Sequence, residues 1–280
     1  MDGSAVLPLN GTDLFYTVQG PEHGIPVLLI HGWTCDMTDW AFQIALLLLA
    51  QTLRVITMDL RGHGRSFAAR NTTSFDPIAM ASDAAALLGH LGVSAEHQAI
   101  VMGHSLGGTV VTELVSSYPD LVQGHVVVDP AYTLVPEDVG SLIPALKEDF
   151  DTTVAEFFSA VYTPGTPDFI PQWHKLRSWS ADEEIMITVV EQMVEYHGPG
   201  GAEFLKTKKV PGVPRLVTVA TEAGIVVEKE AGIDDEYDQV ELMEVGHWIM
   251  QNGHEQFNTV LVNWLKEWGW VPTNTTAGVI

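Results

Sequence analysis

A serine at position 105 stands between two glycines in the sequence GHSLG at residues 103–107. An apolar run at residues 99–102 comes before this motif, and a stretch with helical periodicity, residues 106–117, comes after it. A serine at a sharp turn between strand and helix adopts strained backbone angles, so small neighbours are needed there. Such a turn lifts the Ser105 Oγ clear of the sheet and points N–H groups of the helix start at an oxyanion beside it. The motif therefore predicts Ser105 as a nucleophile.

A histidine near the end of the chain has the chemistry that this serine needs. His247 lies in the sequence GHW at residues 246–248, directly after an apolar run. An imidazole with a pKa near neutrality can accept the serine proton and return it to a leaving group. We expect His104, which directly precedes the serine, to be structural and to point away from it. His247 is therefore the predicted general base.

The periodicity of apolar residues predicts the elements that must position these groups. Continuous apolar runs of the kind found in buried parallel strands lie at residues 27–30, 55–58, 99–102, 126–128 and 216–219. Helical segments are expected at residues 39–50, 77–91, 106–117 and 254–268. An antiparallel pair, residues 5–9 and 13–18, precedes them. This alternation of strand and helix is typical of βαβ units around a parallel sheet.

The alternation stops between residues 132 and 213, where we expect an inserted helical cap. The rest of the chain, residues 1–131 and 214–280, would form the core domain. Most of the aromatic residues in the cap should pack between cap and sheet. Trp173 and Trp179 lie on a stretch without clear periodicity, and we take them as candidates for binding a substrate.

Two further motifs complete a set of four. HGW at residues 31–33 ends the first apolar run, and DLRGHGRS at residues 59–66 follows the next one. All four motifs, in this order, resemble those of the α/β-hydrolase superfamily, and the cap lies where that family places its cap. The resemblance implies an α/β-hydrolase fold with a mostly parallel eight-stranded sheet flanked by helices, and a triad of serine, acid and histidine. It also implies an oxyanion hole formed by the backbone N–H groups of Trp33 and Leu106.

The acid of the triad is where the sequence departs from the commonest family pattern. Many members carry an aspartate soon after the strand that follows the cap, but alanine, Ala223, stands at that place here. Asp129, which ends the strand after the nucleophile helix, corresponds to the acid position of some haloalkane dehalogenases and of the fungal zearalenone lactonases. Glu222 is the alternative, one residue out of register with a longer side chain, and Glu228 is a third candidate. Either of the first two could orient His247 and stabilise its imidazolium form.

Composition limits the partners. The chain of 280 residues carries a formal net charge of −23, which disfavours nucleic acid and anionic membranes and fits a neutral small molecule better. No run approaches the roughly 18 apolar residues of a membrane span, and residues 1–4 lack the features of a signal peptide. The single cysteine, Cys35, cannot form an internal disulfide, so we expect a cytoplasmic protein. No phosphate-binding or metal-ligand motif is present, and we expect neither a cofactor nor a metal. The oligomeric state stays open.

The leading hypothesis is a serine hydrolase that cleaves a carboxylic ester or lactone of a neutral, largely apolar molecule through an acyl-serine intermediate. The serine argues against the aspartyl-ester route of epoxide hydrolases and haloalkane dehalogenases, and an oxyanion hole requires a carbonyl substrate. One alternative is a hydrolase of carbon–carbon bonds, or a tailoring enzyme of secondary metabolism, with the same triad. Another is a small-molecule receptor derived from a hydrolase, because such receptors keep the triad.

Overall fold

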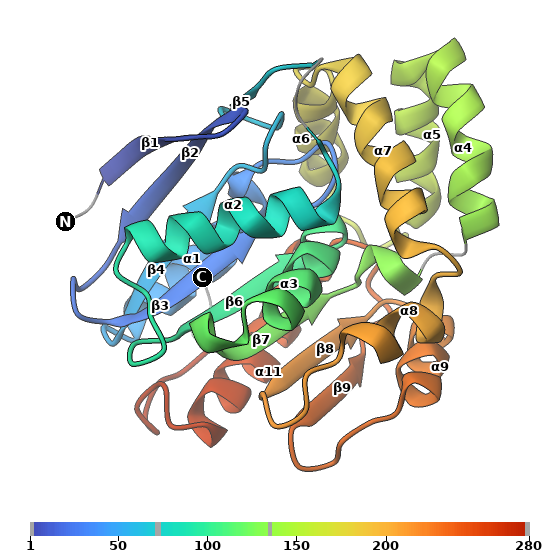
Figure 1. Ribbon diagram of the computed structural model, residues 1–280. Helices are drawn as coiled ribbons and strands as arrows, with labels where there is room; N and C mark the ends of the chain where they lie inside the picture. The colour runs from blue at the N-terminus through green and yellow to red at the C-terminus, as the bar shows by residue number, and fades with distance from the viewer. Residues whose placement is uncertain (1–2, 71–73, 134–135, 278–280) are drawn as a thin grey trace.

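The computed structural model describes residues 3–70, 74–133 and 136–277 and shows the predicted α/β architecture (Figure 1). One mixed sheet in this part of the chain contains the strands β1 Gly3–Leu9, β2 Thr12–Gln19, β3 Ile25–Ile30, β4 Leu53–Met58, β5 Phe67–Ala68, β6 Ala99–His104, β7 Val122–Val128, β8 Arg215–Val219 and β9 Asp238–Leu242. Its main path has the order β1-β2-β4-β3-β6-β7-β8-β9. From β4 to β9 all neighbours are parallel, whereas β2 is antiparallel to β1 and β4.

The sheet differs from the expected eight strands by the addition of β5. These two residues pair antiparallel with the start of β2, where Thr12 lies opposite Ala68. The Thr12 Oγ1 donates to the carbonyl oxygen of Phe67 at 2.6 Å. Such a short segment carries no periodicity that sequence analysis could detect, so the ninth strand was not predicted.

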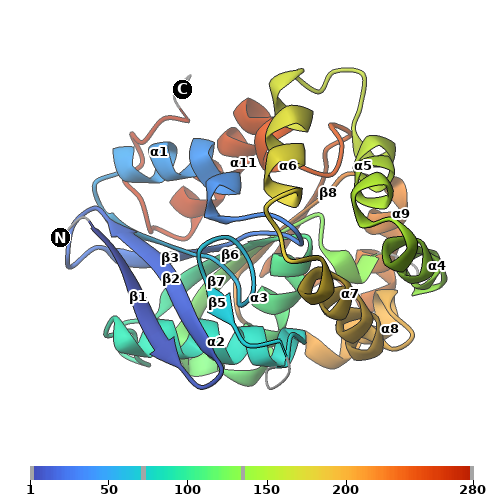
Figure 2. The ribbon, with the colours of Figure 1, turned by 90° about the horizontal axis from the view of Figure 1, so that it is seen from above.

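Helices cover both faces of the sheet, which is why the central strands are continuous apolar runs. The helices of the core are α1 Ala41–Leu49, α2 Pro77–His90, α3 Leu106–Ser117, α9 Glu222–Ala231, α10 Ile249–Asn252 and α11 His254–Glu267. Figure 2 shows α1 and α11 on one face and α2 and α3 on the other. Every residue of β6 is buried between these layers. None of the helices in the described part of the chain is both long and apolar enough to cross a lipid bilayer.

Between β7 and β8 the described chain is helical. It contains α4 Pro136–Glu148, α5 Phe150–Val161, α6 Phe169–Ser178, α7 Glu183–His197 and α8 Gly201–Lys208. Helix α6 corrects one expectation, because it includes Trp173 and ends just before Trp179, where no regular element was expected. Helices α4 to α7 gather at one end of the core (Figure 1). The division into a cap at residues 132–213 and a core on either side stays a prediction.

Aromatic side chains form part of the contact between the cap helices and the loop after β3. The ring of Trp33, which follows β3, contacts the rings of Phe150 and Phe157 on α5 edge to face. Its Nε1–H donates to the carbonyl oxygen of Met186 on α7 at 3.0 Å. Burial of such rings supplies most of the favourable free energy of this contact. The loop after β3 and the cap are therefore packed as one unit.

A buried ion pair joins β8 to α9 below the edge of the sheet. Arg215 donates to both oxygens of Glu228, at 2.8 and 3.0 Å, and Tyr132 donates to Glu228 at 3.0 Å. Both partners of the pair are almost fully buried. Removal of one partner would leave an uncompensated charge in the interior. Glu228, the third candidate for the acid, is thus engaged in a structural contact.

We expect Arg215→Met to lower the free energy of unfolding by about 3–5 kcal/mol, because it leaves the Glu228 charge buried without a counter-ion. Chemical unfolding followed by circular dichroism measures the loss. The double variant Arg215→Met/Glu228→Leu removes both charges and should regain most of the stability. A single variant as stable as the wild type would contradict this account.

Buried neutral histidines should make the stability depend on pH. Burial lowers the pKa of His63 to about 3 and, as the first cause in each, that of His174 and His197 to about 4. The unfolded chain protonates its histidines near pH 6.5, so between about pH 6.5 and 4 it binds protons that the folded state does not. We therefore expect the free energy of unfolding to fall as pH decreases through this range, by up to about 1.4 kcal/mol per pH unit for each group. Urea titrations at several pH values measure this slope.

A matched pair of variants isolates one histidine. His197→Gln should reduce the slope, because it removes a buried histidine with a lowered pKa, and His23→Gln, at an exposed position, is the control for the loss of one histidine. Equal slopes in the wild type and His197→Gln would show that His197 does not contribute.

Candidate active site

The turn that carries Ser105 connects β6 to α3 and has the geometry expected of a nucleophile elbow. Ser105 has φ +54° and ψ −116°, a conformation that non-glycine residues rarely adopt. Its N–H donates to the carbonyl oxygen of Val128 at 2.9 Å, and its own carbonyl accepts from Ala131 at 3.0 Å. These bonds to the end of β7 hold the strained conformation in place.

The two glycines of the motif are required by close backbone contacts. A Cβ on Gly103 would lie 2.1 Å from the carbonyl oxygen of Gly107. A Cβ on Gly107 would lie 2.4 Å from the carbonyl oxygen of Ile30 and 2.5 Å from that of His31. A Cβ atom does not come this close to a non-bonded oxygen, so any side chain at these positions would move the start of α3 away from β3. The glycines thus set the position of the elbow against the neighbouring strand.

The register of three parallel strands brings the functional loops together. Ile30 at the end of β3 pairs with Gly103 of β6, and His104 pairs with Val128 at the end of β7. The residues that follow these strands therefore lie side by side at the carboxyl edge of the sheet, which is where open α/β sheets bind ligands. This places the HGW loop, Ser105 and Asp129 at one site.

His247 and Asp129 form a close pair at this edge. The Nδ1 of His247 lies 2.6 Å from Oδ2 of Asp129. Because an ionised carboxylate can only accept, Nδ1 carries the proton and Nε2 keeps a lone pair. The other oxygen of Asp129 accepts from the N–H of Ala220 at 2.9 Å. Asp129 has a φ of +40°, because the chain turns sharply after β7. The arrangement prepares His247 to accept a proton through Nε2.

The alternative acid is placed differently. Glu222 is the first residue of α9 and is exposed. The turn between β8 and α9, where many family members carry the acid, here supplies the N–H of Ala220 to Asp129. The geometry therefore favours Asp129 over Glu222, while the catalytic role of Asp129 stays a prediction.

The HGW loop lies directly against the nucleophile. A Cβ on Gly32 would lie 3.3 Å from the Cβ of Ser105. The Nε2 of His31 accepts from the N–H of Leu60 at 2.9 Å, so its Nδ1–H donates to the carbonyl of Gly32 at 2.7 Å. Leu106 is the first residue of α3, and its N–H has no acceptor within the helix. Both predicted oxyanion donors, the N–H groups of Trp33 and Leu106, thus belong to segments that border Ser105.

The DLRGHGRS segment, residues 59–66, packs next to the HGW loop and is bonded to the turn that follows it. The carboxylate of Asp59 accepts from the N–H groups of Met37 and Arg65, both at 2.8 Å. Burial, as the first cause, raises the pKa of Asp59. These bonds join the segment to the turn after the HGW loop, so its role here is structural.

An aromatic cluster lies beside His247, and sequence analysis did not assign its members to the site. Trp248 is buried beside His247 with ring centroids 5.1 Å apart. Phe158, Tyr162 and His174 of the cap contact the Trp248 ring at 4.8, 5.4 and 4.0 Å. Trp248 adjoins the GHW histidine, which was the available signal, whereas the cap residues carried no motif.

The two tryptophans predicted to bind a substrate have other contacts. Trp179 is 55% exposed, and the Lys175 ammonium lies 4.6 Å from its ring centre. The Arg177 guanidinium lies over the ring of Trp173 at 4.8 Å. None of the ring contacts described for them involves the triad, and their role in binding stays a prediction.

The environment of Cys35 differs from that of a reactive thiol. Cys35 is buried, and burial, as the first cause, raises the pKa of its thiol well above the usual value, which opposes a nucleophilic role. No cluster of three or more histidine, cysteine or acidic side chains within the described ranges is arranged to hold a metal ion.

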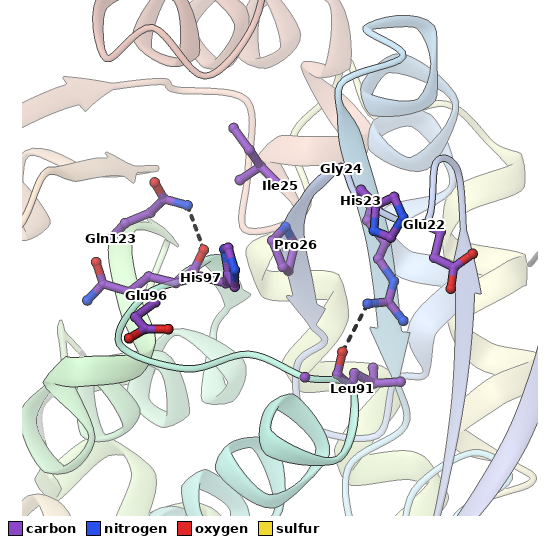
Figure 3. Close-up of a pocket in the computed structure, with 12 residues that line it drawn as sticks. Glu22, His23, Gly24, Ile25, Pro26, Leu91, Glu96, His97 and Gln123 are labelled. Atoms are coloured by element: carbon purple, nitrogen blue, oxygen red, sulfur yellow. Dashed lines mark hydrogen bonds between the residues drawn. The ribbon is translucent and has the colours of Figure 1, made fainter.

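A cavity of about 600 Å³ lies at the opposite edge of the sheet (Figure 3). It borders the start of β3, at Ile25 and Pro26, and the segment before β6. Arg54 donates to the carbonyl oxygen of Leu91 at 3.0 Å in its wall. Because the triad lies beyond the carboxyl ends of these strands, this cavity is separate from the candidate active site.

Comparisons with known proteins agree with this geometry. A model of the alpha/beta hydrolase family matches residues 27–260. The chain is 40% identical over 107 residues to a non-heme chloroperoxidase from Streptomyces lividans, covering 38% of this chain and 37% of that protein. It is 33% identical over 150 residues to a bifunctional esterase/perhydrolase from Acinetobacter calcoaceticus, covering 53% and 52%. The matches thus span about half or less of the length of these curated relatives.

Solved structures share the fold over almost the whole chain. An esterase from Exiguobacterium antarcticum superimposes with a TM-score of 0.78 at 21% identity, covering 95% of this chain and 100% of that one. An enol-lactonase from Burkholderia xenovorans gives a TM-score of 0.77 at 19% identity, covering 94% and 100%. With the family model matched over most of its length, the chain belongs to the alpha/beta hydrolase family.

Proposed function

We propose that this protein is a serine hydrolase that cleaves a carboxylic ester or lactone of a neutral, largely apolar small molecule. The observation that carries the proposal is the 2.6 Å contact between His247 and Asp129 at the sheet edge where Ser105 occupies its strained turn. A base oriented by a carboxylate beside a serine elbow is the arrangement used for acyl transfer. Relatives named as esterases and structural neighbours named as esterase and lactonase support the same reaction class.

The proposed reaction passes through an acyl-serine. His247 Nε2 accepts the Ser105 proton while Oγ attacks the carbonyl carbon, and Asp129 stabilises the resulting imidazolium. The N–H groups of Trp33 and Leu106 donate to the oxyanion. The imidazolium then protonates the leaving alcohol oxygen as the carbon–oxygen bond breaks. A water molecule, activated by the same histidine, releases the acid; in a lactone the alcohol stays attached to the product.

Charge and lining support the substrate class. Aromatic side chains lie near the candidate catalytic residues: Trp248 is beside His247, and Phe158 and Tyr162 pack on Trp248. The net charge of −23 disfavours an anionic substrate, as well as nucleic acid and anionic membranes as partners. The single buried cysteine, Cys35, supports a reducing compartment, and we propose the cytoplasm.

Ser105→Ala should abolish the burst of product from a chromogenic short-chain ester and lower kcat by about 10⁵- to 10⁶-fold, the scale for removing a triad serine. Stopped-flow absorbance measures the burst, and mass spectrometry of the quenched enzyme measures the acyl adduct. Ser117→Ala is the matched control, because Ser117 lies at the far end of the same helix. Wild-type protein without activity on esters, lactones or thioesters would refute the proposal.

Asp129→Asn should lower kcat by about 10⁴-fold, because an amide cannot hold His247 with its proton on Nδ1 and a lone pair on Nε2. Glu222→Gln should have nearly normal activity, because Glu222 is exposed on α9. Steady-state kinetics of the two purified variants separates the two carboxylates. The reverse result, loss in Glu222→Gln with near-normal turnover in Asp129→Asn, would transfer the role to Glu222.

A further inference from the structure

A buried carboxylate, Asp39, joins the cap to the segment that carries His247. Asp39 lies in the short 3₁₀ helix Met37–Trp40 that follows the HGW loop, and it is fully buried. Its Oδ1 accepts from Nη1 of Arg177 on cap helix α6 and from Nε2 of Gln251 at 2.9 Å. Burial opposes the charge of Asp39, but the Arg177 guanidinium beside it holds the pKa of this carboxyl well below its usual range. An ionised acceptor therefore lies at the interface of cap and core.

The hydrogen bonds that lead to Asp39 all point in one direction. Gln251 donates through Nε2 to atoms of Asp39 that can only accept, so its Oε1 accepts from Nε2 of His174 at 2.8 Å. The Nδ1 of His174 then accepts from the hydroxyl of Tyr162, also at 2.8 Å. This order requires a neutral His174, and burial lowers its pKa to about 4. Aligned hydrogen bonds of this kind polarise and strengthen one another.

Asp39 faces the His247 segment at two points. Gln251 follows His247 by one helical turn, in α10. His104 donates through Nε2 to the carbonyl oxygen of His247 at 3.0 Å, and its Nδ1 lies 3.8 Å from Oδ2 of Asp39. That oxygen and that nitrogen are both buried without a hydrogen-bond partner among the described residues. Asp39 thus lies between His104, whose imidazole donates to the backbone of His247, and Gln251, which lies one helical turn after His247.

The cap adds a direct contact to the same segment. The N–H of His247 donates to the carbonyl oxygen of Val161, the last residue of α5, at 3.1 Å. Tyr162 comes next in the chain, and its ring packs on Trp248. The cap residues of this network come from two helices. Tyr162 directly follows α5, and His174 and Arg177 lie on α6.

We propose that Asp39 is a positioning residue that fixes His247 for proton transfer. The cap completes the hydrogen-bond network around Asp39 through Arg177 and through the chain Tyr162–His174–Gln251. The proposal rests on the proposed function, in which His247 is the general base. Errors of about 1 Å in the position of a catalytic group can lower a rate by about 10²-fold. The network would thus make the activity depend on a seated cap.

The main test replaces the ion pair by apolar side chains. Asp39→Leu/Arg177→Met leaves no unpaired charge in the interior, because Asp36, the other partner of Arg177, is partly exposed, so the protein should stay folded, as thermal unfolding will show. Gln251 loses its hydrogen bond and His104 a packing contact, and we expect kcat to fall by about 10- to 100-fold while KM stays within about twofold. Asp39→Asn keeps an acceptor for Arg177 and Gln251, and Asp36, 3.7 Å from Arg177, balances the charge. Asp39→Asn should therefore regain most of kcat.

A milder comparison applies if the double variant does not fold. Tyr162→Phe removes the first donor of the chain and should lower kcat by about 3- to 10-fold, the scale of one hydrogen bond. Tyr196→Phe is the matched control, because its hydroxyl also joins the cap to a core carboxylate, Glu113, outside the network. In a Gln251→Leu background, Tyr162→Phe should have no further effect, because the chain is already broken. Equal effects of the two tyrosine variants, or additive effects with Gln251→Leu, would overturn the proposal.

A spectroscopic measurement separates this proposal from the proposed function. The Nδ1 proton that His247 donates to Asp129 should give a downfield NMR signal in protein with ¹⁵N-labelled histidine, without any substrate. The signal should shift or broaden in Asp39→Leu/Arg177→Met and in Tyr162→Phe, but not in Tyr196→Phe. If the wild type cleaves no acyl substrate but the signal shifts, positioning holds and the proposed function fails. If esters are cleaved and the folded double variant keeps both kcat and signal, the positioning role of Asp39 is refuted.

Discussion

The contact between the start of α3 and the end of β3 is the constraint on which the active site depends. Gly107 lies against the carbonyl oxygens of Ile30 and His31 with no space for a Cβ. This close contact places the nucleophile elbow beside the HGW loop, so that Ser105 lies close to the N–H groups of both segments. The register of β6 with β3 and β7 then determines where Asp129 lies. The positions of the candidate catalytic groups thus depend on a packing contact between backbone atoms.

Sequence analysis could predict the core and the candidate triad because both depend on local patterns. Buried parallel strands are continuous apolar runs, and the residues that end them, Ser105 and Asp129 among them, must meet at one edge. The position of Asp129 and Glu222 relative to His247 depends on the register of the strands, which is not a local property. Sequence analysis could therefore name candidates for the acid but could not choose between them. Strand β5 was missed because two residues have no period.

The surroundings of His247 could not be predicted for a related reason. Asp39, Arg177 and Gln251 are far apart in the chain, and each taken alone is an ordinary polar residue. They meet only because helix α6 packs against Asp39 and α10, and no sequence pattern gives that packing. The surroundings of Trp179 depend on the cap in the same way: a tryptophan suggests a wall of a pocket, but the packing of the cap decides how much of the ring is exposed.

The position of the acid after β7 has a consequence for the order in which the enzyme is made. Ser105, Asp129 and the HGW loop all precede the cap in the chain, so they leave the ribosome before it, and domains tend to fold from the N-terminal side during synthesis. His247 emerges only after α4 to α8 have been synthesised. Under the proposed mechanism, a nascent chain therefore has its candidate nucleophile and acid early, and its candidate base only after the cap has been synthesised.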